Sequence, residues 1–412
     1  MCASSPQAPT RQPSEANVPF EKTRGCFNMT PSDGRSITLP QELIDLILEL
    51  TDQTTLKVCS RVASAFRYTS QRRLFSDLLL MRSRDRPHPI AGFSKILIRS
   101  PHLALHVRSL RILEDSFNPR PSTMSAQLSS ILSMFVNLNK ISIDSQSRLD
   151  WNSDVLAAFR DTIKSSTLTS VRIANSTFER SSQLISLLQS NRSLEFLALS
   201  RVGVQKIDMI EVDAGSQLRL RSLEIDLYPV MRSVTSVIDP QCLRHLRITA
   251  VLFEDLDSNT IQCLLDNASH LNHCHFHCPE ICFTLNISAY SFRSHLRLQT
   301  LEFSVTDYWT PEMYDWAVGI LSGVPNPSPV QHVILNVRVH LDMPWRSNFI
   351  GYLTHLQLVL TAPPVAPLRR VTVRLNSYDG SHIGVGIEQE IRDALPVLRD
   401  RGLLEVVLLE RN

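Results

Sequence analysis

The chain has 412 residues, of which 43% are hydrophobic and 20% are charged, so it can bury a sizeable core and is not disordered throughout. Its 42 Lys and Arg residues nearly balance 40 Asp and Glu residues, and the formal charge of +2 gives no general attraction to nucleic acid or to a membrane surface. Only 12 residues are glycine and no glycine-rich phosphate-binding loop is present, so we expect no nucleotide cofactor.

Residues 1–35 contain five prolines and little apolar pattern. Such a stretch cannot bury enough surface to offset the entropic cost of ordering it, so we predict a disordered tail. It lacks the apolar centre of a signal peptide, and the apolar runs of the chain are far shorter than the ~20 residues that cross a bilayer. The eight cysteines are irregularly spaced, and we expect a cytoplasmic or nuclear protein with free thiols.

Residues 36–82 predict a module of three short helices. Pro40 suits the first turn of a helix, where its missing N–H has no helical partner, and apolar residues follow it on one stripe. Asp52 offers a break and a new cap before the second helix, and a last apolar set that includes Leu78 and Met81 closes the segment. Such a module has a core too small to be stable alone, and it often leaves an apolar stripe for a partner.

The same segment resembles an F-box, especially the type common in fungal F-box proteins. The motif runs Leu39-Pro40-Gln41-Glu42-Leu43-Ile44-Asp45, then Leu56-Lys57-Val58-Cys59-Ser60, then Phe66, which stands where many relatives carry Trp. The resemblance implies a three-helix module that docks on the Skp-type adaptor of an SCF ubiquitin ligase and, through it, on a cullin ligase. The residues implied to dock are Leu39, Pro40, Leu43, Ile44 and Ile47, and those implied to pack the module or extend its surface are Leu56, Val58, Val62 and Phe66.

Residues 93–412 repeat a pattern: a Leu or Val, an apolar anchor three residues later, and another apolar residue two positions after that. The anchors are Leu110, Ile141, Val171, Leu197, Leu223, Leu246, Cys274, Leu301, Val333, Val371 and Val406. Helical stretches lie between many of them, at 127–135, 155–163, 184–188, 261–265, 313–321 and 391–398. We therefore predict an α/β solenoid with one curved parallel sheet inside and helices or loops outside, which resembles the irregular leucine-rich repeats that follow the F-box in many such proteins.

Alternation along each predicted strand assigns the side chains to two faces. If the anchors point into the core, the residues one before, one after and three after them point to the concave surface. Charges of mixed sign and histidines gather there between the strands of Leu223 and Leu301, as on surfaces that recognise a partner protein; the alternative is an ordinary solvated face. The residues predicted to bind a target protein are Glu224, Asp226, His245, Arg247, His273, His275, His277 and Glu302. Unperturbed histidines titrate near pH ~6.5, so we expect binding there to vary across physiological pH.

The stretch from His273 to Cys282 invites a zinc interpretation, because it is rich in histidine and cysteine. Zinc requires four such ligands that converge as a tetrahedron. In a strand, the three histidines face one side while Cys274 and Cys278 face the other, so we expect no metal site. Cys274 occupies an anchor position, as small buried cysteines do.

The sequence favours a protein without catalytic activity, since no Ser or Cys stands in a clear arrangement with a base. The F-box resemblance implies a substrate-recognition subunit of an SCF-type ubiquitin ligase, whose repeats bind the target. The first alternative is a repeat scaffold outside ubiquitination, in which the N-terminal helices only cap the solenoid. The second is a nucleic-acid binder that uses arginine-rich faces, and the balanced charge disfavours it.

Overall fold

The structure is a computed structural model that describes residues 39–82, 89–114, 128–150, 153–164, 167–208, 217–226, 230–249, 258–278, 291–292, 295–305, 311–325, 328–339, 345–362, 368–377 and 386–409. The predicted disordered tail, residues 1–35, lies outside these ranges. In the ranges that are described, no helix is both long enough and apolar enough to cross a membrane.

Twelve strands in the described ranges form one parallel sheet, and they lie in the sheet in the order in which they occur in the chain. They are β1 (Asp77–Arg82), β2 (Ser109–Glu114), β3 (Lys140–Asp150), β4 (Ser170–Arg180), β5 (Phe196–Lys206), β6 (Ser222–Asp226), β7 (His245–Thr249), β8 (His273–Cys278), β9 (Thr300–Val305), β10 (His332–Val339), β11 (Arg370–Ser377) and β12 (Leu404–Leu409). Each repeat thus contributes one strand and packs on the repeats before and after it. The prediction of an α/β fold with one parallel sheet is confirmed.

The register of the strands explains why the repeats stack. Leu223, Leu246, Cys274 and Leu301 lie opposite one another on four successive strands, as their spacing predicts. All four side chains are at most 1% exposed. The residues three before and two after each anchor are buried as well, so every repeat adds apolar side chains to one continuous core.

The sheet differs from the prediction at both ends. At the C-terminal end, Val371 pairs with Leu404, so the last anchor is Leu404 and not Val406. The repeat pattern requires a Leu or Val three residues before the anchor. Leu403 meets this requirement for Val406, whereas Arg401 stands at that position for Leu404, so the pattern selects Val406. At the N-terminal end, the apolar set that predicted a third helix lies partly in β1, which pairs with β2. The sheet therefore begins at Asp77, inside the segment 36–82.

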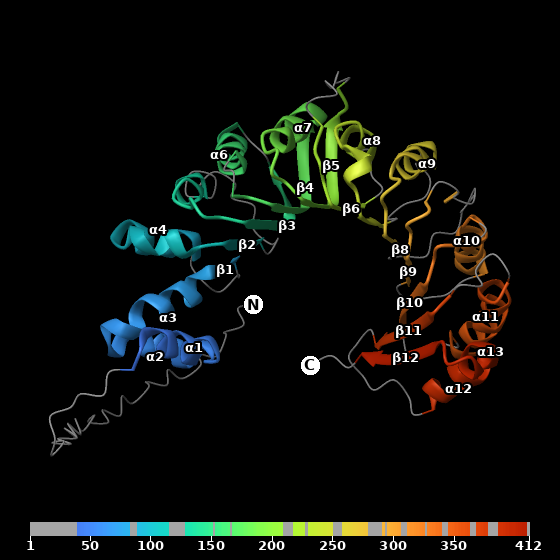
Figure 1. Cartoon of the computed structure of the whole chain (residues 1–412). Coiled ribbons are helices and arrows are strands. Elements are labelled where there is room, and N and C mark those ends of the chain that lie inside the picture. Colours follow the sequence, from blue (N-terminus) through green and yellow to red (C-terminus); the bar gives the residue numbers. More distant parts are fainter. Residues whose placement is uncertain are drawn as a thin grey trace, which may run out of the picture.

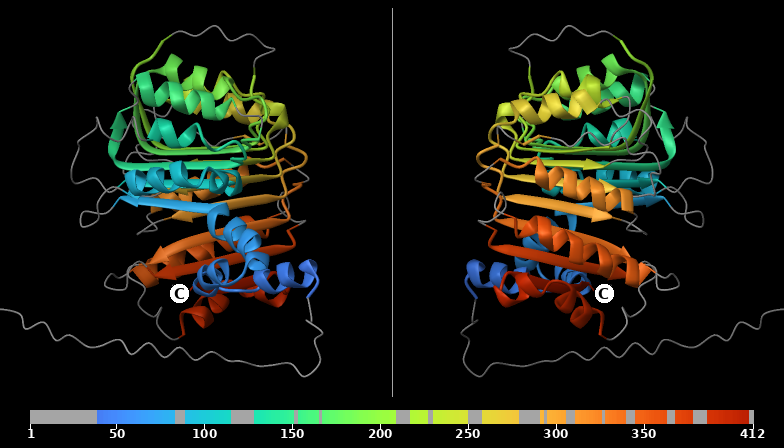
Figure 2. Two further views of the ribbon diagram at one scale, coloured as in Figure 1. Left: turned by 90° about the vertical axis from the view of Figure 1, so that its left-hand side faces the viewer. Right: turned by 90° about the vertical axis from the view of Figure 1, so that its right-hand side faces the viewer.

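Helices cover the outer side of the sheet, and the chain forms an arc whose strands line the inner side (Figure 1). The side views show the same two layers, with the strands stacked across the arc (Figure 2). The helices that follow β1 include α4 (Pro89–Arg99), η1 (Pro101–His106), α6 (Ser153–Ile163), α7 (Ser181–Gln189), α8 (Val230–Thr235), η3 (Pro240–Cys242), α9 (Ser258–Asn267), α10 (Pro311–Ser322), α11 (Trp345–Leu360), α12 (Ile387–Ala394) and α13 (Pro396–Asp400). The predicted helical stretches at 155–163, 184–188, 261–265 and 313–321 lie in α6, α7, α9 and α10, whereas α11 was not predicted.

Three helices precede the sheet: α1 (Gln41–Glu49), α2 (Gln53–Val62) and α3 (Ser64–Ser76). Asp52 caps α2, because its carboxylate accepts hydrogen bonds from the backbone N–H groups of Thr54 at 2.8 Å and Thr55 at 3.0 Å. The end of α3 adjoins the sheet, where the N–H of Arg108 donates to the carbonyl of Ser76 at 2.9 Å. The three helices therefore stand at the N-terminal end of the arc (Figure 1).

Candidate functional site

The first candidate site is an apolar surface on the N-terminal helices. Seven large apolar side chains lie exposed on α1, on α2 and on the residues that flank α1: Leu39, Leu43, Leu46, Ile47, Leu50, Val58 and Val62. Each of them is between 46% and 85% exposed. Leu43, Ile47 and Leu50 follow one another at spacings of four and three residues, which is one face of a helix, and an exposed apolar stripe of this kind marks a surface that binds a partner. We call these seven residues the N-terminal apolar surface.

Most of the residues predicted to dock on an adaptor belong to this surface. Leu39, Leu43 and Ile47 are exposed, as is Pro40, and Val58 and Val62 extend the surface along α2. Ile44 is a correction, because it is only 7% exposed and packs inside the module. Its side chain lies on the buried face of α1, opposite the exposed stripe.

The module has a small core of its own. Ile44, Leu48 and Leu56 are buried together, and Phe66 packs against them while remaining partly exposed. Leu56 and Phe66 therefore pack the module, which is one of the two roles that the sequence allowed them. This core is separate from the core of the solenoid.

Polar contacts hold α1 against α3. The hydroxyl of Thr69 donates to the carboxylate of Asp45 at 2.6 Å, and the side-chain amide of Gln41 donates to the same oxygen at 2.8 Å. These hydrogen bonds, that of Thr69 first, lower the pKa of Asp45. Arg73 donates from α3 to the carbonyls of Leu48 and Thr51 at the end of α1. The exposed apolar stripe is thus presented by helices whose relative positions are fixed.

The second candidate site is a polar row on the inner side of the arc. The strand register places Glu224, Arg247, His275 and Glu302 opposite one another on β6 to β9, as predicted. His245 and His273 pair two residues before Arg247 and His275, and their ring centroids are 6.0 Å apart. His277 lies two residues after His275 and therefore on the same face, with the ring centroids 6.1 Å apart. We call these residues, without Asp226, the concave row.

Asp226 does not belong to this row as a binding residue. It is only 7% exposed, and its carboxylate accepts hydrogen bonds from the hydroxyl of Ser200 at 2.9 Å and the N–H of Arg201 at 2.7 Å. Burial raises the pKa of Asp226 despite these bonds. Arg201 has φ of 53°, a left-handed conformation that is costly for a residue with a side chain, and Asp226 stabilises it. The prediction that Asp226 contacts a target is therefore corrected to a structural role.

Glu302 is the best-connected residue of the concave row. Its carboxylate lies 3.1 Å from the Nε2 atom of His273 and 3.8 Å from that of His275, and it accepts a hydrogen bond from Asn336. Burial acts to raise the pKa of Glu302, but the hydrogen bond from His273, the nearby His275 ring and the hydrogen bond from Asn336 together outweigh it, so the pKa lies well below its usual range. Glu302 is therefore a fixed negative charge among histidines.

The two central histidines are neutral at physiological pH. Burial lowers the pKa of His275 far below its usual value, and the positive charge of Arg247 adds to the effect. Burial and the same arginine lower the pKa of His277 to about 4. The expectation that they titrate near pH ~6.5 is wrong, because it assumed solvated rings. The Nδ1 atom of His277 is buried and has no hydrogen-bond partner in the described part of the chain.

The sequence did not identify three further members of this surface. Arg172 reaches across the small side chain of Ala198 and forms an ion pair with Glu224 at 2.8 Å, two strands away. Ser304 shares a hydrogen bond of 2.7 Å with His275, and Asn336 donates to Ser304 at 2.9 Å. All three occupy the same alternating positions as the predicted residues, so the signal was present. The predicted patch ran only from the strand of Leu223 to that of Leu301, which left out Arg172 and Asn336, and it took only charged residues and histidines, which left out Ser304.

The histidines and Cys274 lie on opposite faces of β8, as the alternation predicts. Cys274 is fully buried, and burial strongly raises the pKa of its thiol, so the thiol stays protonated. The histidines face the inner side of the arc. No group of three or more side chains suited to a metal ion was found in the described ranges.

Comparison with known proteins adds no relative to this picture. No protein-family model matches the chain, and no curated protein matches it either.

Proposed function

We propose that this chain is the substrate-recognition subunit of an SCF-type ubiquitin ligase. The helices α1 to α3 dock on a Skp-type adaptor and, through it, on a cullin ligase, while the concave row of the leucine-rich-repeat-like solenoid binds the target protein. The chain itself performs no chemistry. It raises the effective concentration of the bound target near the ligase.

The observation that carries this proposal is the N-terminal apolar surface. Ile44, Leu48 and Leu56 already fill the interior of the module, so the exposed residues are not needed to pack it. Most of these side chains are about half exposed, so each contributes about 1 kcal/mol before the cost of association if it loses its remaining accessible area on docking. Several such residues on two fixed helices suit a permanent partner, and the F-box resemblance names the Skp-type adaptor.

A second function is favoured by the position of the helices. The hydrogen bond between Arg108 and Ser76 joins α3 to the start of the sheet, so the module also covers the N-terminal end of the core. Solenoids need such a cap to shield their terminal repeat from solvent. In this alternative the chain is a repeat scaffold with no role in ubiquitination, and the exposed apolar surface has no ligase partner.

A binding experiment with purified Skp-type adaptor separates the two functions. We expect the full chain to retain the adaptor in a pull-down, and the variant Leu39→Ala/Pro40→Ala to lose at least about tenfold in affinity, because both residues are exposed and outside the module core. The matched control is Leu296→Ala/Leu358→Ala, which removes apolar area that is exposed elsewhere on the solenoid. Adaptor binding that is absent, or equal in all three proteins, would refute the docking proposal. The alternative would then remain, in which the three helices only cap the solenoid.

A further inference from the structure

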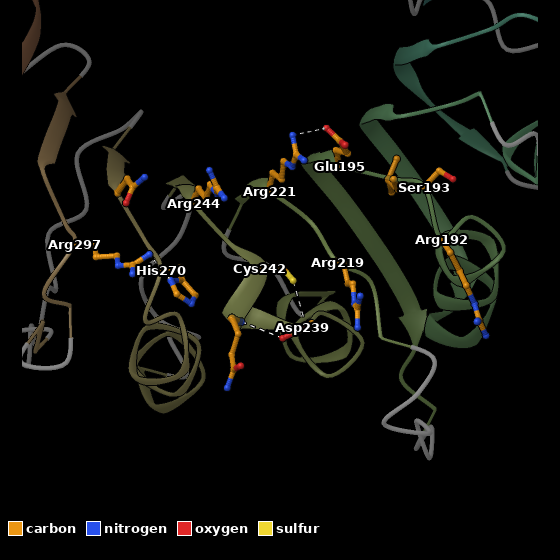
Figure 3. A pocket seen from close by; sticks show the side chains of 13 residues that line it. Arg192, Ser193, Glu195, Arg219, Arg221, Asp239, Cys242, Arg244, His270 and Arg297 are labelled. Atoms are coloured by element: carbon orange, nitrogen blue, oxygen red, sulfur yellow. Dashed lines mark hydrogen bonds and ion pairs between the residues drawn. The ribbon is translucent and has the colours of Figure 1, made fainter.

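A groove of about 670 Å³ lies beside the points where the chain enters β6, β7 and β8, outside the concave row (Figure 3). Five arginines line it: Arg192, Arg219, Arg221, Arg244 and Arg297. The lining contains two carboxylates, Glu195 and Asp239, so the groove has three more positive than negative charges. The whole chain has a formal charge of only +2, which makes this a local concentration of positive charge.

The repeat geometry places these residues in two rows. One row stands two residues before the anchors and includes Arg221 and Arg244, and the other stands four residues before them and includes Arg219 and Arg297. The leucines three residues before the anchors, among them Leu220 and Leu243, are buried. Alternation about them turns the residues on either side outward, so Arg219 and Arg221 both reach the groove. The N–H of Arg221 donates to the carbonyl of Glu195 at 2.8 Å and that of Arg244 to Arg221 at 2.9 Å, which sets these residues side by side on successive repeats.

Both carboxylates of the groove are already occupied. Glu195 forms an ion pair with Arg221 at 3.4 Å. Asp239 accepts hydrogen bonds from the N–H of Gln241 at 3.1 Å and from the thiol of Cys242 at 3.4 Å. Arg192, Arg219 and Arg244 form an ion pair with none of the carboxylates in the described ranges, and all three are exposed. Their guanidinium groups are therefore available to an anionic partner.

We infer that this groove binds an extended, carboxylate-rich segment of a partner protein. The arginines are spread along the repeats from β5 to β9, a distance of about 19 Å at the spacing of parallel strands, which about six extended residues span. Guanidinium groups bind carboxylates in pairs of parallel hydrogen bonds. Asn272 and Gln241 offer side-chain amides to the backbone of such a segment. This binding does not depend on whether the chain docks on an adaptor.

The chemistry of the lining favours a protein over a nucleic acid. Proteins that bind single-stranded nucleic acid combine a basic groove with aromatic side chains on which bases stack. The lining of this groove contains no Phe, Tyr or Trp.

The test is fluorescence anisotropy with the full chain and a short labelled peptide in which Glu alternates with Ser. We expect saturable binding that weakens with added salt, and no binding of the matched peptide in which Gln replaces Glu. The variant Arg219→Glu/Arg244→Glu is expected to lose at least about tenfold in affinity. The control Arg99→Glu/Arg111→Glu changes the net charge equally at exposed positions outside the groove and is expected to bind as the original chain does.

Three outcomes would overturn the inference: no binding of the acidic peptide at low salt, an equal loss in both double variants, or tighter binding of single-stranded DNA that depends on Arg219 and Arg244. The first and second would show that the groove is only a solvated rim, and the third that its partner is a nucleic acid. Circular dichroism of each variant confirms that the fold is intact. The adaptor pull-down does not involve these residues. It tests docking on the adaptor, whereas the peptide experiment tests the groove, so either proposal can fail without the other.

Discussion

At the scale of single residues, burial changes what the concave row can do. His275 lies between Arg247 and Glu302, and His277 lies between Thr249 and Ser304. Burial together with the charge of Arg247 favours the neutral form of both rings. Neutral imidazole can both donate and accept a hydrogen bond, so these rings contribute polarity and shape, not charge. The fixed charges of the row are Arg247, Glu224 and Glu302.

These lowered pKa values predict how stability depends on pH. In the unfolded chain the two histidines take up protons as the pH falls through ~6.5, whereas in the folded chain His277 takes one up only near pH about 4. Between these limits the unfolded state binds more protons, so the free energy of unfolding falls as the pH falls, by about 3 kcal/mol for His277 alone. From pH 7 to 8 the contribution of these two residues to the free energy of unfolding should be constant.

Denaturant unfolding at a series of pH values checks this expectation. The variant His275→Gln/His277→Gln should have a shallower slope between pH ~6.5 and ~4, because glutamine does not titrate. His102→Gln, at an exposed position on η1, is the matched control and should leave the slope as it is. An unchanged slope in the double variant would mean that other groups control stability in this range.

At the scale of elements, the four strands β6 to β9 form a unit with a mixed-charge inner face. The ion pair between Arg172 and Glu224 fixes one end of the row, and the contacts of Glu302 with His273 and Asn336 fix the other. Arg247 stands between these ends and forms an ion pair with no carboxylate in the described ranges. Because a wrong partner meets a like charge somewhere along such a face, it suits specific recognition more than high affinity.

If the concave row binds the target protein, the variant Arg247→Glu/His275→Ala should bind that target much more weakly. Reversing the unpaired charge puts negative charges on β6, β7 and β9, at Glu224, position 247 and Glu302, and these charges repel an acidic contact. We expect affinity purification under proteasome inhibition to recover the original chain's targets with this variant at a yield reduced at least about tenfold. Recovery of the same targets at the same yield would place the binding site elsewhere, and Arg111→Glu serves as the charge control at an exposed position of β2.

At the scale of the whole molecule, two cores of very different size lie in series. The solenoid core runs through all the repeats, whereas the core of α1 to α3 has three buried apolar residues. In a solenoid each repeat stabilises its neighbours, so central strands such as β4 and β5 gain support from both sides. The N-terminal module has a neighbour on one side only.

Hydrogen exchange should reveal this difference. We expect the amides of α1 and α2 to exchange faster than those of β4 and β5 by at least about tenfold, because local opening exposes a smaller core. Mass spectrometry of peptic fragments measures both regions in one experiment. Addition of saturating Skp-type adaptor should slow exchange in α1 and α2 while β4 and β5 remain as they were, since a ligand stabilises the state to which it binds. Equal protection of the two regions without adaptor would contradict the separation of the cores.

The sequence by itself determined the repeat architecture and the faces of the strands. The anchors from Leu110 to Val371 align because apolar side chains at a fixed offset must meet in one core, and the same alternation predicts Glu224, Arg247, His275 and Glu302 side by side. Only the tertiary structure decided that β1 joins the sheet, that Leu404 is the last anchor and that Ile44 and Asp226 are buried, because partners far away in the chain settle these points. It alone also brought the arginines before successive strands into one groove and neutralised the central histidines, since desolvation and neighbouring charge depend on what packs around a residue and not on its place in the sequence.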